Sequence, residues 1–397
     1  MQQDFDELNF LVGNAQNLNG VENLPALPIF SERMLEFFAA LSNAILKDKR
    51  SREFAHVTAF AYWIRRAAIE KEKTARQDIL DSRLGRGIAF HIAPSNVPLA
   101  FAMSFTVAAL AGNANIVRLS KREFIEAEIV CDAMNKLLQN DYQDLQKYFT
   151  IVRYPHNDEI TKSFSDICDV RIIWGGDNTI NTIRKIPLPP RSIELTFADR
   201  HSIALIQAEK FLEMNPAEVA KKFYLDTYDI DQNACSSPRA VIWLGDKVEE
   251  SKKIFWAAVE NLVHSRYEMY PIQAVDKFSA ACMFGMDFEG IKILPGDNFI
   301  TRIEVENLSG DFMHNKPGGG FFVEYVAKNY SEVLPLLNKQ CQTIAVLGIE
   351  PKDFRAWIIS QGVRGVDRIV NFGETVTLAY MWDGFDLIRE MSRFIEA

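Results

Sequence analysis

The sequence predicts an α/β fold in which a doubly wound parallel sheet forms one domain and a second α/β domain follows it. Three observations support this prediction. The chain has 397 residues, enough for two or three domains, and its 48% hydrophobic and 24% charged residues are ordinary for a globular protein. From residue 87 onward, short apolar runs alternate with segments of helical periodicity. A proline-rich connector, Pro187, Pro189 and Pro190, then precedes a second series of the same kind.

The first part of the chain, up to about residue 80, is expected to be helical. Ser31 can cap a helix over residues 32–44, and residues 53–69 carry apolar side chains at helical spacing. These helices form an N-terminal arm ahead of the alternating region.

Residues 87–117 contain no Lys, Arg, Asp or Glu, which raises the alternative of a membrane span. Pro94 and Pro98 break the first part of this segment, and three asparagines place amides where lipid would penalise them. We therefore expect buried elements of a sheet protein: strand 87–92, helix 98–111 and strand 114–119. A helix that is buried between two buried strands needs such continuous apolarity.

The same alternation continues along the chain. In the first domain we expect helix 124–138, strand 149–152, helix 158–164, strand 170–174 and helix 178–185. In the second α/β region, which begins near Ile193, we expect strand 202–207, helix 216–224, strand 240–244 and helix 252–264. Strands separated by helices of this length form right-handed crossovers and hence parallel sheets. The expected domains are residues 1–200, residues 201–375 and a short amphipathic tail helix in residues 376–397.

The charge balance and the cysteine count exclude several classes of protein. There are 44 basic and 53 acidic residues, and the net charge of -9 disfavours a nucleic-acid partner. Five cysteines without a Cys-x-x-Cys pair, and six scattered histidines, disfavour a disulfide framework or a metal site. The N-terminus, Met-Gln-Gln-Asp-Phe-Asp-Glu, has acidic residues where a secretory signal has basic ones. We expect a reduced, cytoplasmic protein without a membrane span.

Cys235 is the strongest candidate nucleophile. It lies in the segment Asp-Ile-Asp-Gln-Asn-Ala-Cys-Ser-Ser-Pro-Arg, between an expected helix and an expected strand. Polar neighbours and access favour the thiolate, which is the reactive form of cysteine. The alternative is an incidental or buried cysteine, which is the more common case. The other four cysteines, at positions 131, 168, 282 and 341, lie in apolar sequence and are expected to be structural.

Asn96 lies in the turn Ala-Pro-Ser-Asn-Val-Pro at residues 93–98, between a strand and a helix. Two prolines fix this turn, so that the Asn96 amide can stabilise a developing oxyanion in an acyl-transfer site, together with a backbone N–H. The alternative is that Asn96 is only the N-cap of the following helix.

Two further strand ends carry features that suit a phosphate-bearing cofactor. The segment Arg-Leu-Ser-Lys-Arg at residues 118–122 follows one strand, and a basic residue at such a strand end can bind a ribose 2′-phosphate. A solvated helix start is the alternative for this segment. Gly175 and Gly176 follow another strand, where the amides of a helix start can face a pyrophosphate. This second motif is weak, since no Gly-x-Gly-x-x-Gly pattern occurs in the chain.

Together these motifs resemble the LuxC-type acyl-CoA reductases, the fatty acid reductases of bacterial light-emission systems, which belong to the aldehyde dehydrogenase superfamily. The matching segments are His-Ile-Ala-Pro-Ser-Asn-Val-Pro (91–98), Gly-Asn-Ala-Asn-Ile-Val-Arg-Leu-Ser (112–120) and Asn-Ala-Cys-Ser-Ser-Pro-Arg (233–239). The resemblance covers about residues 85–390. It implies an aldehyde-dehydrogenase-like fold, in which the doubly wound sheet is a dinucleotide-binding domain and the second α/β domain is catalytic. His91 enters only as part of the first motif, and we expect it to be a packed strand histidine.

The resemblance also implies a reaction. Cys235 attacks an acyl thioester and releases coenzyme A or another thiol carrier, and Asn96 with the backbone N–H of Cys235 holds the oxyanion. NADPH then reduces the acyl-enzyme to an aldehyde. By similarity, the cofactor-binding residues are Arg118, Ser120, Lys121, Gly175 and Gly176. The family further implies a homo-oligomer and a complex with an acyl-protein synthetase that delivers the acyl group.

The chain departs from the superfamily pattern in two places. The Glu-Leu-Gly-Gly segment of the superfamily corresponds to Glu-Leu-Thr-Phe at residues 194–197, which makes Glu194 a candidate catalytic residue without an assigned step. Ile180 or Asn181 replaces the last glycine of a Gly-x-Thr-x-x-Gly pattern. The preference for NADPH over NADH is therefore inferred from the basic cluster and the family.

Other functions stay open at this point. An oxidative aldehyde dehydrogenase or an acyl-phosphate reductase would have the same fold. A non-catalytic scaffold that binds an acyl-protein synthetase is a further alternative. A membrane protein depends on residues 87–117 alone. The Pro-Gly-Gly-Gly run at residues 317–320 is either a mobile loop near the site or a plain turn.

Overall fold

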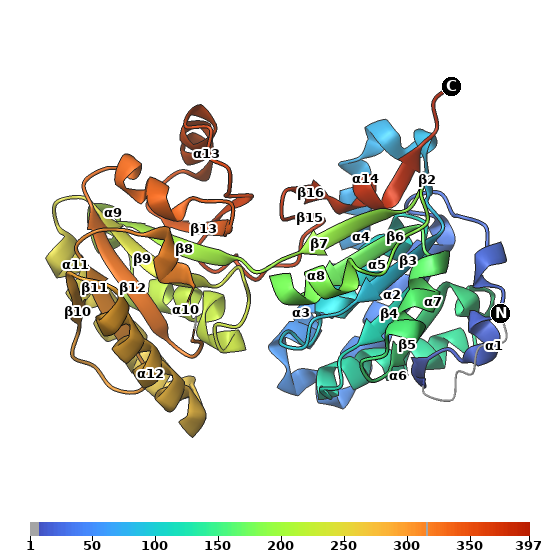
Figure 1. Ribbon diagram of the computed structural model, residues 1–397, viewed down its shortest axis with the longest axis horizontal. Helices are drawn as coiled ribbons and strands as arrows, with labels where there is room; N and C mark the ends of the chain where they lie inside the picture. The colour runs from blue at the N-terminus through green and yellow to red at the C-terminus, as the bar shows by residue number, and fades with distance from the viewer. Residues whose placement is uncertain (1–7, 315–316) are drawn as a thin grey trace. The chain divides into compact units, whose positions relative to one another are not determined.

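The structure is a computed structural model that describes residues 8–314 and 317–397. The chain divides into two compact units (Figure 1). Unit 1 comprises the chain up to Ala198 together with Leu378–Ala397, and unit 2 comprises Asp199–Thr377. The acidic N-terminal stretch that argues against a secretory signal lies outside the described residues.

Unit 1 is built on a six-stranded sheet with the order β1-β5-β4-β3-β6-β7. Its strands are β1 (Asn9–Val12), β3 (Ile88–Ile92), β4 (Ala114–Leu119), β5 (Phe149–Arg153), β6 (Val170–Trp174) and β7 (Ile193–Phe197). Strand β1 pairs antiparallel to β5, and the other pairs are parallel. The chain moves outward from β3 in both directions, so the predicted doubly wound sheet is confirmed. Its topological switch point lies between β3 and β6.

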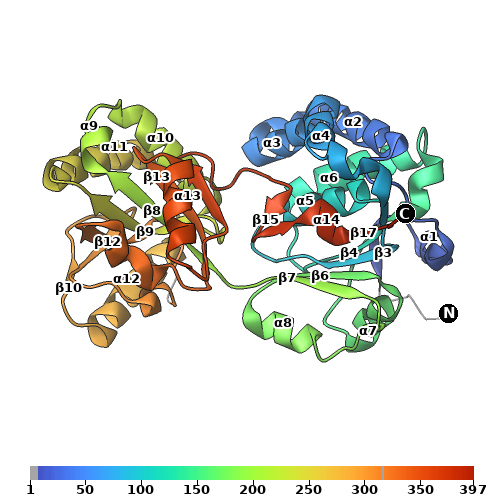
Figure 2. The ribbon, with the colours of Figure 1, turned by 90° about the horizontal axis from the view of Figure 1, so that it is seen from above.

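Helices cover both faces of this sheet, as Figure 2 shows. One face carries α2 (Glu32–Lys47), α3 (Ala55–Trp63), α4 (Arg66–Thr74), α5 (Ala100–Leu110) and α6 (Ile125–Leu138). The other carries α7 (Asp158–Ile167) and α8 (Asp177–Ile183). Because the sheet is covered on both sides, its central strands are apolar on both faces, and all five residues of β3 are buried.

The uncharged segment at residues 87–117 forms β3, α5 and most of β4, as predicted. Helix α5 is buried from Phe101 to Leu110 because it packs on β3 and β4 and is covered by α2 and α14 (Leu387–Met391). Among the described residues, no helix combines the length and the apolar character that crossing a membrane requires. The segment is divided among a strand, a helix and a strand, and it is not one long apolar helix.

The structure corrects three other expectations in unit 1. Strand β7 pairs in parallel with β6, so the chain from Ile193 still belongs to the first sheet and the prolines before it connect α8 to β7. The single helix expected over residues 53–69 is two, because Arg65 is extended between α3 and α4. Ser31 occupies the N-cap position of α2, but its side chain makes no capping hydrogen bond.

Unit 2 contains a seven-stranded sheet with the order β10-β11-β12-β9-β8-β13-β14. Its strands are β8 (His201–Gln207), β9 (Pro238–Leu244), β10 (Ile291–Ile293), β11 (Thr301–Val305), β12 (Phe321–Ala327), β13 (Cys341–Leu347) and β14 (Arg368–Asn371). All pairs are parallel except β10 with β11.

Alternate residues of each central strand in unit 2 belong to two separate hydrophobic cores, one on each face of the sheet. Ile203 and Leu205 of β8 belong to one core, and Ala204 and Ile206 belong to the other. The first core is completed by α12 (Pro271–Asp287) and α13 (Pro351–Ser360). The second is completed by α9 (Ala208–Leu212), α10 (Pro216–Asp226) and α11 (Val248–Arg266). The sheet of unit 2 is therefore also sandwiched between helices.

The C-terminal tail belongs to unit 1. Its elements are β15 (Met381–Trp382), β16 (Phe385–Asp386), α14 and β17 (Ser392–Phe394), and β17 pairs antiparallel with β2 (Arg83–Gly85). The expected tail helix is thus a short turn of helix between strands. Its apolar residues Leu387, Ile388 and Met391 are buried in the core of unit 1.

Candidate active site

Several predicted site residues of unit 1 gather at one edge of its sheet. Asn96 follows β3, Ser120 and Lys121 follow β4, and Gly175 follows β6. Because these strands are parallel and adjacent, their carboxyl ends meet at the same edge. This edge includes the topological switch point between β3 and β6, where doubly wound folds bind their ligands.

Asn96 is exposed in the loop between β3 and α5. Helix α5 begins at Ala100, and Leu99 occupies its N-cap position without a side-chain cap. The alternative that Asn96 is merely the helix cap was therefore wrong. It lies in a bend of the proline-flanked loop at the carboxyl edge of the sheet.

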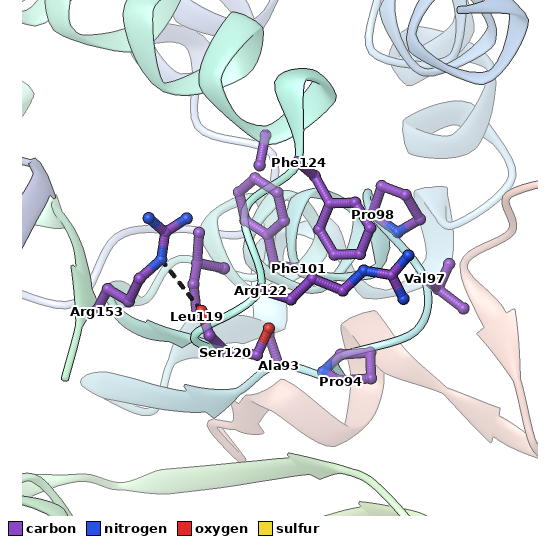
Figure 3. A pocket seen from close by; sticks show the side chains of 11 residues that line it. Ala93, Pro94, Val97, Pro98, Phe101, Leu119, Ser120, Arg122, Phe124 and Arg153 are labelled. Carbon is purple, nitrogen blue, oxygen red and sulfur yellow. Dashed lines mark hydrogen bonds between the residues drawn. The ribbon is translucent and has the colours of Figure 1, made fainter. Parts of the chain in front are cut away.

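A small hollow opens between the loops that follow β3 and β4 (Figure 3). It is lined by Ala93, Pro94, Val97, Pro98, Phe101, Leu119, Ser120, Arg122, Phe124, Ala127 and Arg153. Ser120 is the one predicted cofactor residue in this lining, and Arg118 and Lys121 are not part of it. The hollow has a volume of about 10 Å³, roughly the space of one water molecule, so it is a shallow depression beside apolar and cationic side chains.

Two arginines of this hollow were not among the named cofactor residues, and Arg153 was missed by the sequence analysis altogether. The guanidinium carbon of Arg122 lies 4.7 Å above the ring of Phe124. Arg153 donates from Nε to the Ser120 carbonyl at 3.1 Å, as Figure 3 shows, and from Nη1 to the Glu123 carboxylate at 3.0 Å. Arg122 was quoted only as the end of a basic cluster, and Arg153 stands at the end of β5 without a local signal.

Arg118 lies within β4, with its guanidinium carbon 4.8 Å above the ring of Tyr154. Burial raises the pKa of Tyr154 to about 12, so this ring stays neutral beneath the cation. The Nε atom of Arg118 is buried and has no hydrogen-bond partner among the described residues. A buried N–H without a partner costs free energy, which a bound anion or water would offset.

Gly175 and Gly176 connect β6 to α8. The Gly175 amide donates to the Phe197 carbonyl at 3.2 Å, and a Cβ at Gly175 would approach the Thr179 side chain to 3.2 Å. Gly176 occupies the N-cap position of α8 and makes no side-chain cap. This backbone can approach a ligand closely, but Asp177 in the first turn of α8 opposes an anion.

Glu194 lies near the amino end of β7, away from the carboxyl edge. Its carboxylate pairs with Arg171 Nη2 at 2.6 Å and with Arg184 Nε at 2.7 Å. Arg171 is 2% exposed, so Glu194 neutralises a buried cation. This geometry describes an ion pair of the sheet, and it gives Glu194 no open face for a reacting group.

His91 is a packed strand histidine, as expected. It is fully buried, with Nδ1 2.7 Å from the Ser104 hydroxyl and Nε2 3.0 Å from the side-chain Oδ1 of Asn115. Burial lowers the pKa of His91 to about 4, so its imidazole is neutral at neutral pH. It holds β3, α5 and β4 together.

Cys235 lies in unit 2, in the loop between η5 (Tyr228–Ile230) and β9. Its side chain is partly exposed. The loop sits at the amino ends of β8, β9 and β13: the Cys235 carbonyl accepts from the Ser202 hydroxyl at 2.7 Å, and that hydroxyl accepts from the Thr343 amide at 3.1 Å. The sulfur accepts a hydrogen bond from Gln342 Nε2 at 3.2 Å. Sequence analysis missed Gln342, which stands 107 residues further along the chain.

The loop that carries Cys235 is fixed from its other side by the Pro-Gly-Gly-Gly run. Arg239 Nη1 donates to the Pro317 carbonyl at 2.7 Å, and Gln232 Oε1 accepts from the Gly320 amide at 3.0 Å. Gly320 has φ +93, and a Cβ there would lie 2.3 Å from the Phe299 carbonyl oxygen, so only glycine fits. The run therefore packs against the loop that carries Cys235 and stabilises it, and it is more than a plain turn.

Two residues of the loop before Cys235 adopt the left-handed conformation: Asp231 has φ 54 and Gln232 has φ 56. Residues with side chains avoid this region, at a cost of about 1–3 kcal/mol. The contacts that hold them are the Tyr267 hydroxyl, which donates to Asp231 Oδ1 at 2.6 Å, and the bonds of Gln232 to β12. Such stored strain is typical of a pre-organised functional loop.

The remaining cysteines divide by exposure. Burial raises the pKa of Cys131, Cys168 and Cys341 to about 12, so these thiols are inert. Cys282 is exposed on α12, which corrects the expectation that it is a packed structural residue. Ala280, Ala281 and Phe284 form the buried side of that helix instead. Cys235 is therefore distinguished by its contacts rather than by access alone.

The comparisons with known proteins agree with these motifs. A family model described as acyl-CoA reductase (LuxC) matches residues 8–394. A long-chain acyl-protein thioester reductase from Vibrio harveyi is 26% identical over 344 residues, covering 79% of this chain and 68% of that protein. One of the same name from Photorhabdus laumondii is 25% identical over 299 residues, covering 72% of this chain and 58% of that protein. The chain thus spans 58% to 68% of the length of these relatives.

Solved structures show the fold to be aldehyde-dehydrogenase-like, as predicted. Aldehyde dehydrogenase 21 from Physcomitrella patens, in complex with the product succinate, matches with a TM-score of 0.69 and 13% identity over 95% of this chain and 87% of that chain. A 3,6-anhydro-L-galactose dehydrogenase in complex with NAP matches with a TM-score of 0.60 and 12% identity over 91% of this chain and 88% of that chain.

Proposed function

The chain belongs to the acyl-CoA reductase (LuxC) family, and we propose that it reduces a fatty acyl thioester to an aldehyde with NADPH. The observation that carries the proposal is the Cys235 site, a partly exposed thiol whose sulfur accepts an amide hydrogen bond within a braced loop. The relatives named long-chain acyl-protein thioester reductases support a thioester as the substrate. The acyl donor is acyl-CoA or an acyl group on a carrier or partner protein.

In the first step, the Cys235 thiolate forms a bond to the acyl carbon, and the bond from that carbon to the sulfur of the carrier breaks. The carrier leaves as a thiolate that takes a proton from solvent. The acyl-enzyme keeps the acyl group on Cys235, beside the backbone N–H that the predicted oxyanion site uses. Asn96 keeps its predicted role as a second oxyanion donor, which rests on the sequence resemblance.

We propose that unit 1 binds the nicotinamide cofactor at the carboxyl edge of its sheet. The groups at this edge that can donate to a cofactor phosphate are the Ser120 hydroxyl, the Arg122 guanidinium and the buried N–H of Arg118. Bound NADPH would supply the hydride that takes the acyl group to the aldehyde level. The Arg122 cation supports NADPH over NADH, because a 2′-phosphate is the feature that the two cofactors do not share, whereas the charge of Arg153 is already paired with Glu123.

We assign the rest of the cofactor site to the loops after β4 and β6, as the sequence predicted. Lys121 is exposed just beyond β4, and Gly175 and Gly176 present main chain near the switch point for the pyrophosphate. Glu194 is left outside this proposal, since its two ion pairs already account for its charge.

The partners and the compartment are part of the same proposal. An acyl-protein synthetase would deliver the acyl group, in keeping with the names of the relatives, and the reductase would act as a homo-oligomer in the cytoplasm. The five free cysteines support a reducing compartment.

The test is intact-mass analysis after mixing the protein with long-chain acyl-CoA, first without and then with NADPH. We expect a mass increase of one acyl group that Cys235→Ala lacks and that NADPH discharges as free aldehyde. Oxidation of aldehyde with NAD and water, in the absence of any acyl adduct from a thioester, would replace the proposal by an oxidative dehydrogenase. Cys282→Ser is the matched control, because it removes the other exposed thiol.

A further inference from the structure

The amide of Gln342 contacts the reacting sulfur. Its Nε2 atom lies 3.2 Å from Cys235 Sγ, and the side chain is fully buried at the amino end of β13. The rest of β13 is buried too, and from Ile344 to Leu347 it is apolar. A buried amide in such a strand costs free energy unless its polar atoms are bonded, so this position is expensive for a residue that only fills space.

We propose that Gln342 is a catalytic residue that stabilises the Cys235 thiolate, an inference that rests on the proposed role of Cys235 as the nucleophile. An N–H that donates to the charged form of a thiol favours that form. The amide is neutral, so it stabilises the anion without forming an ion pair that an incoming substrate would have to break. The thiolate therefore remains available as a nucleophile.

Thr343 fixes which end of the amide faces the sulfur. Its hydroxyl lies 3.4 Å from Gln342 Oε1 and donates to it, which leaves the NH2 group directed at Cys235. Thr343 is itself anchored, because its backbone amide donates to the Ser202 hydroxyl that also holds the Cys235 carbonyl. Thr343 is thus a positioning residue, and the same three strands hold both the nucleophile and its hydrogen-bond donor.

A nearby positive charge also favours the thiolate form of Cys235. The positive charge of Arg239 interacts with Cys235, although burial lowers the pKa of Arg239 to about 10. The Arg239 guanidinium donates to the carbonyls of Pro317 and Gln232, which holds it in place. Arg239 supplies a general field, and Gln342 supplies the directional contact at the sulfur.

Gln342 would serve at both ends of the reaction. When the thiolate attacks, its electron pair forms the bond to the acyl carbon and the carrier thiolate leaves. When the reduced adduct collapses, the pair on its oxygen forms the aldehyde carbonyl, and the bond from carbon to Cys235 breaks. The departing thiolate again accepts the N–H of Gln342, so the donor that promotes attack also promotes release.

The experiment measures alkylation of Cys235 by iodoacetamide as a function of pH, in a Cys282→Ser background. Gln342→Met keeps the length of the side chain and removes the N–H. We expect its alkylation at pH 7 to be about tenfold slower than in the parent, the size of one hydrogen bond to a charged group, and to recover at high pH. Thr343→Val should slow alkylation less, because the amide is then free to rotate, and Gln342→Glu should slow it most.

This order of rates is what the proposal requires. Superimposable pH profiles for the parent, Gln342→Met and Gln342→Glu would overturn it, and so would a faster reaction in Gln342→Glu. If Gln342→Met fails to fold, Thr343→Val and Gln342→Glu still decide the order. Alkylation needs neither an acyl donor nor a cofactor. If the alkylation rates follow the expected order but no acyl adduct forms, the result counts against the proposed function and leaves the role of Gln342 standing.

Discussion

Replacing Glu194 by glutamine tests whether this residue acts in catalysis or in stability. Arg171 is 3% exposed at its side chain and donates twice to one Glu194 oxygen, at 2.9 and 2.6 Å. Removing the charged partner of a buried cation costs about 3–5 kcal/mol. Arg171 also donates to the Ile186 carbonyl at 2.9 Å and is 3.3 Å from the Ser165 hydroxyl, and these acceptors remain.

With those acceptors and the new amide oxygen in place, we expect Glu194→Gln to lower the free energy of unfolding by about 2–3 kcal/mol. Arg184 contributes little, since an exposed pair is worth about 0.2–1 kcal/mol. For a unit of about 200 residues, this loss corresponds to a fall in melting temperature of roughly 5–10 °C. Thermal unfolding followed by circular dichroism measures it, and reductase turnover below the transition should stay near that of the parent.

A double variant gives the matched control. Arg171→Met combined with Glu194→Leu removes both charges and fills the same space, so it should be more stable than Glu194→Gln alone. The reasoning would be refuted by a Glu194→Gln protein that melts with the parent but has lost turnover. That result would return Glu194 to the catalytic role that the sequence motif suggested.

Four further outcomes are expected. Asn96→Ala should lower turnover about 100-fold, as loss of one oxyanion donor does, while the alkylation rate of the nucleophile is unchanged; a parent-like rate would remove Asn96 from the mechanism. Arg122→Ala should raise the KM for NADPH more than that for NADH, and equal changes would exclude a contact with the 2′-phosphate. The folded pKa of His91 is lowered from 6.5 to about 4, so its contribution to stability is present above pH 6.5 and is lost as pH falls toward 4. Relative to His91→Gln, urea unfolding should therefore show the parent losing about 2 kcal/mol between pH 7 and pH 5, and parallel curves would contradict this. Gln342→His should increase the free fatty acid released from the acyl-enzyme when NADPH is absent, and an unchanged release would show that a base at this position does not reach water.

The elements that sequence predicted well are those whose burial is complete. The uncharged run at residues 87–117 was predicted as buried strands and a buried helix, because two prolines and three asparagines disfavour a span, and β4 and β6 were placed with their observed bounds. Strand β7 was assigned to the wrong sheet because strand pairing depends on contacts between segments that are distant in sequence. A proline-rich stretch before Ile193 indicates an end to α8, and it carries no information about which sheet the next strand joins.

The candidate site divides along the same line. Cys235 could be found from its neighbours in sequence, since polar residues around a loop cysteine are a local signal. Gln342 could not, because its amide meets the sulfur only after β13 and β8 pair with the register that the fold imposes. Cys282 was misjudged for a different reason: only Ala281 of its two neighbours belongs to the buried face of α12, Met283 is itself 52% exposed, and helical periodicity would have shown this.

An amide beside the sulfur has a chemical consequence for the proposed reaction, which must end at an aldehyde. A histidine at this distance accepts a proton, and a base beside an acyl-enzyme can activate water and divert the acyl group to free acid. The Gln342 amide accepts no proton at neutral pH, so it favours the thiolate without supplying a base. Arg239 stays protonated at neutral pH, since burial lowers its pKa only to about 10, and it too supplies charge rather than a proton acceptor. A thiolate stabilised in this way can be acylated and later released, and the donors that stabilise it do nothing to hasten hydrolysis between the two steps.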